Sequence, residues 1–190
     1  AAFGPIDVLV SGAAGNFPAS ALSMSANAFK TVVDIDLMGT FHVLKLAFPR
    51  LRKPGACIIN VSAPQAAIPM PLQMHVCAAK SGVDMITRVS ALEWASAGVR
   101  VNSIVPGPIA DTEGMARLAP TPDAARQVAQ SIPLGRYGRK QEIADACLWL
   151  ASPMASYVTG VVLPIDGGWS LGGASLSMTG LMQYSSNPAT

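Results

Sequence analysis

The chain has 190 residues, 51% of them hydrophobic and 13% charged, with a formal net charge of +2. This length suits a single domain with a buried core, and the low charge gives no reason to expect nucleic acid or a membrane surface as a partner. No apolar run approaches the roughly 18 residues that span a bilayer. The three cysteines, Cys57, Cys77 and Cys147, lie in apolar segments, and no Cys or His pair has ligand spacing, so we expect free thiols and no metal site.

Apolar periodicity and turn residues predict alternating strands and helices along the chain. In chain order the expected elements are a strand at 6–12, a helix at 25–48, a strand at 56–62, a helix at 73–95, a strand at 99–108, a loop with a short helix at 109–131, a helix at 142–152 and a strand at 157–168. Residues 1–169 are expected to form one domain. Residues 170–190, rich in Ser, Gly and Met, are expected to be a flexible or lid-like tail.

This alternation predicts an α/β fold, a doubly wound parallel sheet of the Rossmann type with helices on both faces. The strands are apolar throughout, as strands covered on both faces are. In such sheets ligands bind beyond the carboxyl ends of the strands. The polar and glycine-rich segments that follow the predicted strands are 13–17, Ser62 and 106–112, so we expect the ligand site there.

The glycine-rich turn that opens a dinucleotide-binding fold is missing from this chain. No G-x-G-x-x-G element follows a first strand. The opening strand at 6–12 is apolar and would form an exposed sheet edge. We therefore expect the fold to lack its N-terminal strands here, and the natural gene to encode about 80–100 further residues upstream.

Six segments together resemble the short-chain dehydrogenase/reductase family, from the first residue to about Trp169. Each segment alone is weak, but all six occur in the family's order and spacing. They are SGAAGNF (11–17), DIDLMGTFHV (34–43), IINVSA (58–63), AAKSGVDMITRVSALEWA (78–95), VRVNSIVPGPI (99–109) and VTGVVLPIDGG (158–168).

The chain departs from the family pattern at the residues that usually carry the reaction. The family uses Asn, Ser, Tyr and Lys, and Lys80 matches the last of these. The tyrosine position holds Val76, the serine position holds Ala63, and the asparagine position holds Asp36. The usual proton relay between alcohol and ketone therefore cannot operate.

The 2,4-dienoyl-CoA reductases, especially the peroxisomal type, share this altered pattern. The matching motifs are AAGNF at 13–17, Asp36 with Gly39-Thr40-Phe41, Pro-Gly-Pro-Ile with Thr-Glu-Gly at 106–114, and His75 ahead of the lysine. The resemblance implies NADPH-dependent reduction of 2,4-dienoyl-CoA to 3-enoyl-CoA in the oxidation of unsaturated fatty acids. A dienoyl thioester needs no phenol acid, because charge moves to the thioester oxygen and a water can deliver the proton to carbon.

The resemblance also assigns roles to particular residues. Asp36 and Lys80 are expected to be catalytic, with Asp36 ionised and paired to Lys80 or to a water. The cofactor NADPH is expected to contact Ala13, Ala14, Gly15, Ser62, Lys80, Pro106, Gly107, Pro108, Ile109 and Thr112. The acyl-CoA substrate is expected to contact Phe17, Ser25, Asn27 and Arg117, the last through a CoA phosphate.

Family members are usually dimers or tetramers, so we expect a homodimer or homotetramer through helices 25–48 and 73–95 and the last strand. The C-terminal Asn-Pro-Ala-Thr lacks a Ser-Lys-Leu type of ending, and with the Ala-rich composition this favours a cytoplasmic location.

Two alternative functions stay open at this point. The chain could be another short-chain reductase that acts on an enoyl or keto substrate, which would need a replacement acid from Tyr137, Tyr157 or Tyr184. It could also be a non-catalytic member that serves as an oligomer partner, which the loss of Ser and Tyr favours. His75 fits either a core role or a functional role.

Overall fold

A four-stranded parallel sheet forms the centre of the computed structural model, which describes residues 4–172. The strands lie in the order β1 (Val8–Ser11), β2 (Cys57–Val61), β3 (Arg100–Pro106) and β4 (Val162–Ile165). Each neighbouring pair is parallel, with Ile58 opposite both Leu9 and Val101. The predicted parallel α/β fold is confirmed.

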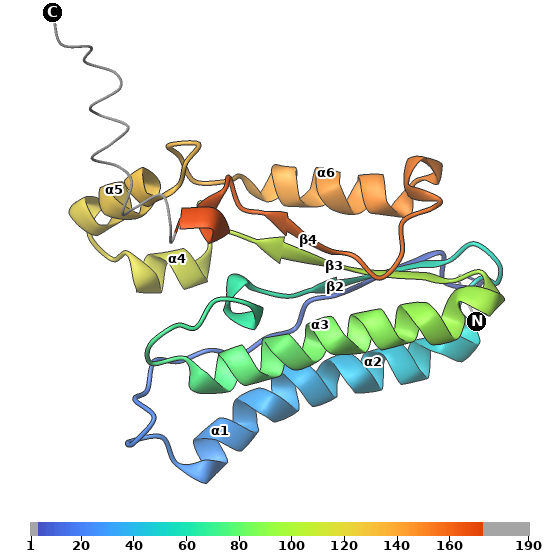
Figure 1. Cartoon of the computed structure of the whole chain (residues 1–190), viewed down its shortest axis with the longest axis horizontal. Helices are drawn as coiled ribbons and strands as arrows, with labels where there is room; N and C mark the ends of the chain where they lie inside the picture. Colours follow the sequence, from blue (N-terminus) through green and yellow to red (C-terminus); the bar gives the residue numbers. More distant parts are fainter. Residues whose placement is uncertain (1–3, 173–190) are drawn as a thin grey trace, which may run out of the picture.

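Helices cover both faces of this sheet, as Figure 1 shows. One face carries α1 (Ala26–Val32), a π-helix (Val33–Met38), α2 (Gly39–Ala47) and the long α3 (Met74–Trp94), and the other carries α6 (Lys140–Ala151). The short helices α4 (Glu113–Leu118) and α5 (Pro122–Ser131) lie near the carboxyl ends of the strands. Short 3-10 turns occupy Phe48–Arg50, Pro64–Ala66, Ala95–Ala97, Pro153–Ala155 and Trp169–Leu171.

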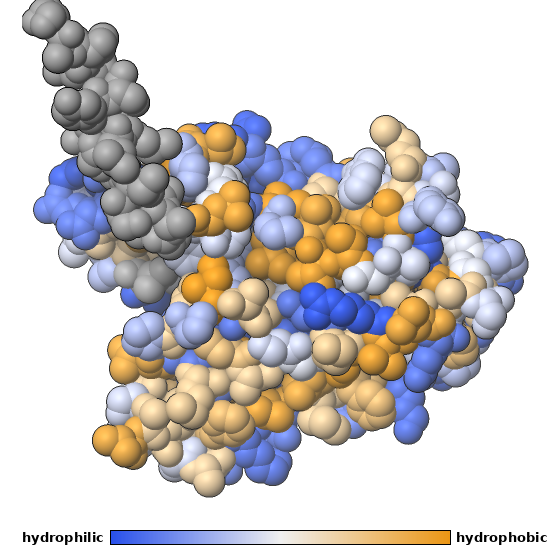
Figure 2. Space-filling model, viewed as in Figure 1, coloured by the Kyte–Doolittle hydropathy of each residue, from blue (hydrophilic) through white to orange (hydrophobic). Residues whose placement is uncertain are grey.

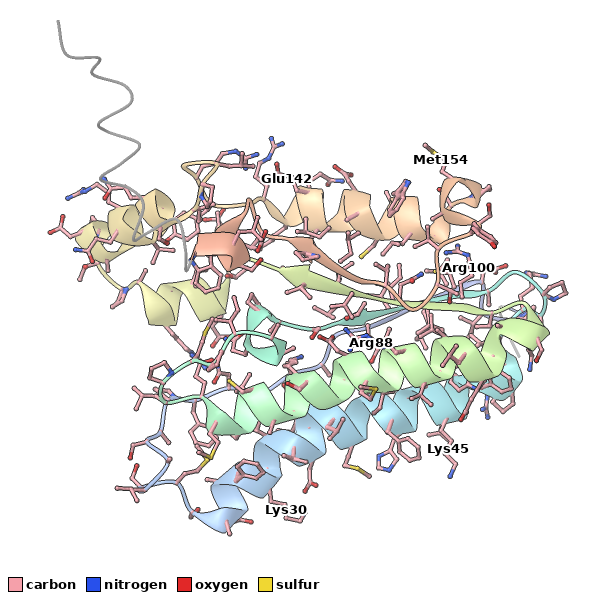
Figure 3. The ribbon with its side chains drawn as sticks, in the orientation of Figure 1. Lys30, Lys45, Arg88, Arg100, Glu142 and Met154 are labelled. Carbon is pink, nitrogen blue, oxygen red and sulfur yellow. The ribbon has the colours of Figure 1, made fainter. Side chains whose placement is uncertain are left out.

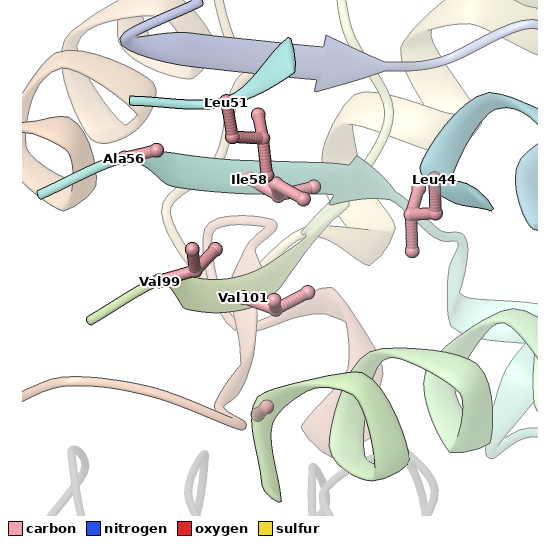
Figure 4. Close-up of a cluster of buried hydrophobic side chains, with 7 residues drawn as sticks. Leu44, Leu51, Ala56, Ile58, Val99 and Val101 are labelled. Atoms are coloured by element: carbon pink, nitrogen blue, oxygen red, sulfur yellow. The ribbon is translucent and has the colours of Figure 1, made fainter. Parts of the chain in front are cut away.

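Alternating side chains of the strands fill two separate cores, because successive residues of a strand point to opposite faces. Figure 4 shows the first core, which contains Ile58 and Val101 of the sheet and Leu44 of α2. On the other face Ile59 and Ile104 pack against Leu150 of α6. The strands are therefore apolar on both faces because each face is covered by helices.

Three segments differ from the sequence prediction. Residues 109–131 form two helices instead of one, because Thr112 and Thr121 each cap a helix start with a side-chain oxygen. The last strand is confined to 162–165, and the segment before it turns at Gly160, whose φ is +75°. Helical spacing predicts that Met74, Val89 and Leu92 lie on the apolar stripe of the 73–95 helix, but they are 54%, 43% and 81% exposed on α3. Helix α3 therefore carries apolar side chains both on the face that packs against the sheet and on exposed positions.

Strand β1 forms one edge of the sheet, and β4 forms the other. Val8 and Val10 of β1 point to the same face of the sheet as Cys57 and Ile59 of β2, which pack with Leu150 of α6. On β1 the two valines remain 44% and 52% exposed. Figure 2 shows apolar side chains gathered along the band between α6 and the sheet at β4. Among the described residues, none of the helices combines the length and apolar character needed to traverse a bilayer. The predicted tail falls largely on 173–190, outside the described residues.

Candidate active site

Asp36 lies in the π-helix that joins α1 to α2, and it is 1% exposed. A π-helix accommodates one more residue per turn than the α-helix around it and often marks functional sites. The Thr40 hydroxyl donates a hydrogen bond to the Asp36 carbonyl oxygen at 2.6 Å, so that oxygen is paired. The wider turn thus holds a carboxylate inside the protein on a helix that is otherwise apolar on this side.

The Asp36 carboxylate connects two other parts of the chain. The Gly15 backbone N–H donates to its Oδ1 at 2.7 Å, and the Lys80 Nζ lies 3.5 Å from its Oδ2. Lys80 is also buried and donates a hydrogen bond to the Val61 carbonyl oxygen at 3.0 Å. The structure therefore brings together the loop after β1, the π-helix, α3 and the end of β2. Of the two partners expected for Asp36, Lys80 or a water, it places Lys80 beside the carboxylate.

The two positions that lost their hydroxyl groups lie next to this pair. Val76 is 3% exposed and packs with Val32 and Ala79 in a small apolar cluster. Ala63 is the second residue after β2 and precedes a 3-10 turn. Its neighbour Ser62 donates its backbone N–H to the Ile104 carbonyl oxygen at 2.9 Å. The Ser62 side chain is buried.

Two buried residues of α3 were not assigned a role from the sequence. Asp84 lies one helical turn after Lys80, and burial raises the pKa of its carboxyl group, while hydrogen bonding with Ser62, the charge of Arg88 and a hydrogen bond from Ser103 work against that rise. His75 is fully buried, and its ring lies 4.4 Å from that of Phe17. The i, i+4 spacing of Lys80 and Asp84 in the sequence indicates that the two side chains lie on the same face of the helix, so Asp84 could have been identified from the sequence. For His75 the sequence could not distinguish a core role from a functional one.

The predicted cofactor loop at 106–112 is a tightly held turn. The Gly107 N–H donates to the Ile165 carbonyl oxygen at 3.0 Å, and a Cβ at this position would lie 2.6 Å from Asp166 Cα. The Gly138 N–H donates to the Pro108 carbonyl oxygen at 3.0 Å. Thr112 donates its hydroxyl to the Ile109 carbonyl oxygen at 2.8 Å and caps α4. Glycine is therefore required where the loop passes the end of β4.

The predicted substrate residues are spread over three segments. Phe17 is partly buried in the loop after β1, and Ser25 caps α1 by accepting from the Ala28 N–H at 3.1 Å. Asn27 is exposed in the first turn of that helix. Arg117 lies on α4, where it forms an exposed ion pair with Glu113. The structure brings Phe17 against α3, but it records no contact that joins the four residues.

A cavity of about 530 Å³ lies between the 106–112 loop, the end of β4 and the start of α6. Glu142 lines it, and a hydrogen bond from Arg136 lowers the pKa of this carboxyl group to about 2. Figure 3 shows Glu142 at the beginning of α6, with Met154 beyond the other end of that helix. The Arg136–Glu142 pair thus fixes the wall behind the predicted cofactor loop. Neither Asp36 nor Lys80 lines this cavity.

Comparison with known proteins connects this geometry to a family. The sequence model of the family described as enoyl-(acyl carrier protein) reductase matches residues 1–170. The chain is 47% identical over 167 residues to the peroxisomal 2,4-dienoyl-CoA reductase of Rattus norvegicus, a match that covers 87% of this chain and 57% of that protein. It is 46% identical over 171 residues to the corresponding protein of Saccharomyces cerevisiae, covering 90% and 58%.

The fold also matches a solved structure, the gluconate 5-dehydrogenase of Burkholderia cenocepacia in complex with NADP and tartrate. The TM-score is 0.83 at 27% identity, over 89% of this chain and 66% of the other. The chain spans less than three-fifths of the length of the rat and yeast relatives. The motifs, the parallel sheet and these matches agree, and the chain belongs to the short-chain dehydrogenase/reductase family.

Proposed function

We propose that the complete protein reduces 2,4-dienoyl-CoA thioesters to 3-enoyl-CoA with NADPH as the hydride donor. The observation that carries this proposal is the buried Asp36–Lys80 pair, at a site where Val76 and Ala63 replace the hydroxyl groups of the usual reaction. Relatives that are 47% and 46% identical over most of this chain are named 2,4-dienoyl-CoA reductases.

The residues present suit a nicotinamide cofactor. Among the described residues the Lys80 ammonium donates one hydrogen bond, to Val61, so two of its three N–H groups remain for ribose hydroxyls. Asp36 Oδ2 is a buried atom without a hydrogen-bond partner among the described residues. Gly107 leaves the loop free of a side chain at the end of β4. When bound, the reduced nicotinamide supplies a hydride.

The side chains at this site suit reduction of a conjugated thioester. Lys80 places a positive charge near the reacting centre, which favours electron flow toward the thioester oxygen. Asp36 binds the Gly15 N–H through one oxygen and leaves the other able to hold a water beside Lys80. That water can deliver the proton to carbon after hydride transfer. Val76 places an apolar side chain where other members have tyrosine.

Reduction of a ketone is disfavoured by where the tyrosines lie. Tyr137 donates its hydroxyl to the Ala125 carbonyl oxygen of α5 at 3.2 Å. Tyr157 is fully exposed after α6, beside the start of β3 near Arg100. Tyr184 lies outside the described residues. Neither described tyrosine can replace the phenol that a ketone reductase needs beside Lys80.

Turnover of 2,4-hexadienoyl-CoA, followed by the loss of reduced nicotinamide absorbance, tests the proposal with the complete protein. We expect turnover by the natural protein and a loss of more than about 100-fold in Asp36→Ala and Lys80→Ala. NADPH should support a lower KM than NADH. Absence of turnover refutes the function, and turnover that survives both substitutions refutes the site.

We also propose that α2 and α3 form the contact between subunits of a homodimer or homotetramer. These helices enclose an open groove of about 810 Å³ lined by apolar side chains, among them Phe41, Met85 and Val89, which are 41%, 55% and 43% exposed. Figure 3 shows Lys45 at the rim of this face. Exposed apolar patches of this kind are typical of protein interfaces.

A cytoplasmic location is a further proposal. The rat and yeast relatives are both named peroxisomal. Imaging of the complete protein with a fluorescent tag at its N-terminus distinguishes the two compartments.

A further inference from the structure

We propose that His75 is a substrate-binding residue that donates a hydrogen bond to the thioester oxygen of the bound dienoyl-CoA. This inference rests on the proposed function and assigns the group that meets the charge formed in the reaction. His75 lies in the first turn of α3, is 0% exposed, and contacts the ring of Phe17 at 4.4 Å between centroids.

The chemistry of the His75 environment does not explain an imidazole as a core residue. Both ring nitrogens are buried and have no hydrogen-bond partner among the described residues. The neighbouring cluster of Val32, Val76 and Ala79, with Phe17 and Leu37 against it, is wholly apolar. Buried polar groups without partners are rare, and an apolar side chain would fill this space without that cost. The imidazole therefore indicates a partner that binds at this position.

The distance from the Asp36–Lys80 pair fits the length of the substrate. His75 precedes Lys80 by five residues, which places it about 7.5 Å away along the axis of α3. The loop after β1 also connects the Asp36–Lys80 pair with His75. The Gly15 N–H donates a hydrogen bond to Asp36, and Phe17, two residues later, contacts the His75 ring. Two residues of extended chain span about 7 Å. Two independent paths therefore give a similar separation.

A dienoyl thioester covers this separation. The carbon that accepts the hydride lies about four bonds from the thioester carbon, or roughly 5 Å. Adding the carbonyl oxygen and a hydrogen bond of about 3 Å reaches a donor at the position of His75. The Phe17 ring packs against the imidazole at a tilt of 50° and belongs to a loop that is mostly exposed, so access of the acyl-CoA to His75 requires Phe17 to move aside.

The electron flow shows why a donor is needed at that end. The substrate accepts hydride at its δ carbon, the δ–γ double bond shifts to γ–β, and the β–α double bond shifts to join the α carbon to the carbonyl carbon. The carbonyl oxygen then carries the negative charge. The α carbon takes a proton from water, the carbonyl re-forms, and the 3-enoyl thioester results. A hydrogen bond from His75 to that oxygen is strongest when the charge is present.

Two substitutions of His75 in the complete protein test the proposal. His75→Phe keeps a ring against Phe17 and removes the donor, and we expect kcat to fall about 100-fold while the unfolding midpoint stays the same or rises. His75→Gln restores a donor and should recover part of kcat. Met74→Phe changes the exposed neighbour on the same turn and serves as the control. If His75→Phe does not fold, His75→Leu takes its place.

A binding measurement separates this inference from the proposed function. Hexanoyl-CoA is a thioester, and S-hexyl-CoA is the thioether that lacks its carbonyl oxygen. Neither compound has the conjugated double bonds that the proposed reaction reduces. The natural protein should bind the thioester more tightly, and His75→Phe should bind both alike. Absence of dienoyl-CoA turnover in the natural protein refutes the proposed function. If the natural protein turns over the substrate, either of two results refutes only the role of His75. One is a kcat of His75→Phe within twofold of that of the natural protein, and the other is an unchanged preference of His75→Phe for the thioester.

Discussion

The buried pair of Asp36 and Lys80 predicts a strong energetic coupling between two side chains. Asp36→Asn keeps the side-chain shape and an oxygen for the Gly15 N–H, but it removes the charge that faces Lys80. Lys80→Met keeps the length of the chain and removes the other charge. At 3.5 Å, the interaction of two unit charges is about 5 kcal/mol at an effective dielectric constant of about 20. Measured costs of breaking buried pairs are about 3–5 kcal/mol.

We expect each single substitution to lower the free energy of unfolding by about 3 kcal/mol, because each leaves one buried charge without its partner. The distance exceeds a hydrogen bond, and Lys80 keeps its bond to Val61, so the lower end of the range applies. The double variant leaves no unpaired charge and should lose far less than the sum of the two changes. The expected coupling is about 2–3 kcal/mol.

Urea unfolding of the natural protein, the two single variants and the double variant measures this coupling, provided that the denaturant slope is the same for all four. The exposed pair Lys30–Asp34 provides a matched control, for which the same cycle should give less than about 1 kcal/mol. Single-variant effects that add within about 0.5 kcal/mol refute the reasoning.

Three further predictions follow from other parts of the fold. Gly107→Ala should lower the free energy of unfolding by about 1–3 kcal/mol, measured by urea unfolding, because its Cβ would overlap Asp166; unchanged stability contradicts the close packing. Glu142 has a depressed pKa of about 2, so its contribution to stability is present above its unfolded pKa near 4.5 and is lost as pH falls from there toward 2. The stability of Glu142→Gln, followed by acid unfolding, should therefore lack this pH-dependent loss. A pH profile identical to that of the natural protein would disprove the contribution of Glu142. Met85→Glu should shift sedimentation toward smaller species, whereas an unchanged assembly excludes the groove as the contact.

The order of elements was predictable from sequence because it depends on local chemistry. The apolar run 56–62 and the stop at Pro106 mark strands without reference to the rest of the chain. Helices α4 and α5 were merged into one because the two threonine caps, Thr112 and Thr121, are weak signals in a segment with little apolar periodicity. Local sequence patterns predict that a segment is helical more reliably than they predict where one short helix ends and the next begins.

The site was predictable in part. The family pattern led us to expect Lys80 or a water as the partner of Asp36, and the structure places the Lys80 Nζ 3.5 Å from Asp36 Oδ2. The bond from Gly15 to Asp36 joins residues that are 21 positions apart, and only the three-dimensional path of the loop brings them together. The contact of Phe17 with His75 has the same origin. Sequence patterns identify the charged groups, whereas the folded chain determines which oxygen or ring each one meets.

The π-helix at Val33–Met38 has a consequence for how this site could arise and be lost. A widened turn of this kind amounts to one residue inserted into a regular helix, and every side chain after it is rotated relative to those before it. Removing any one residue between Asp34 and Met38 would restore a regular helix and turn either Asp36 or Thr40 away from its partner. The site thus depends on the number of residues in this turn as much as on their identity. A scan of substitutions would leave that dependence hidden, whereas a scan of single deletions would reveal it.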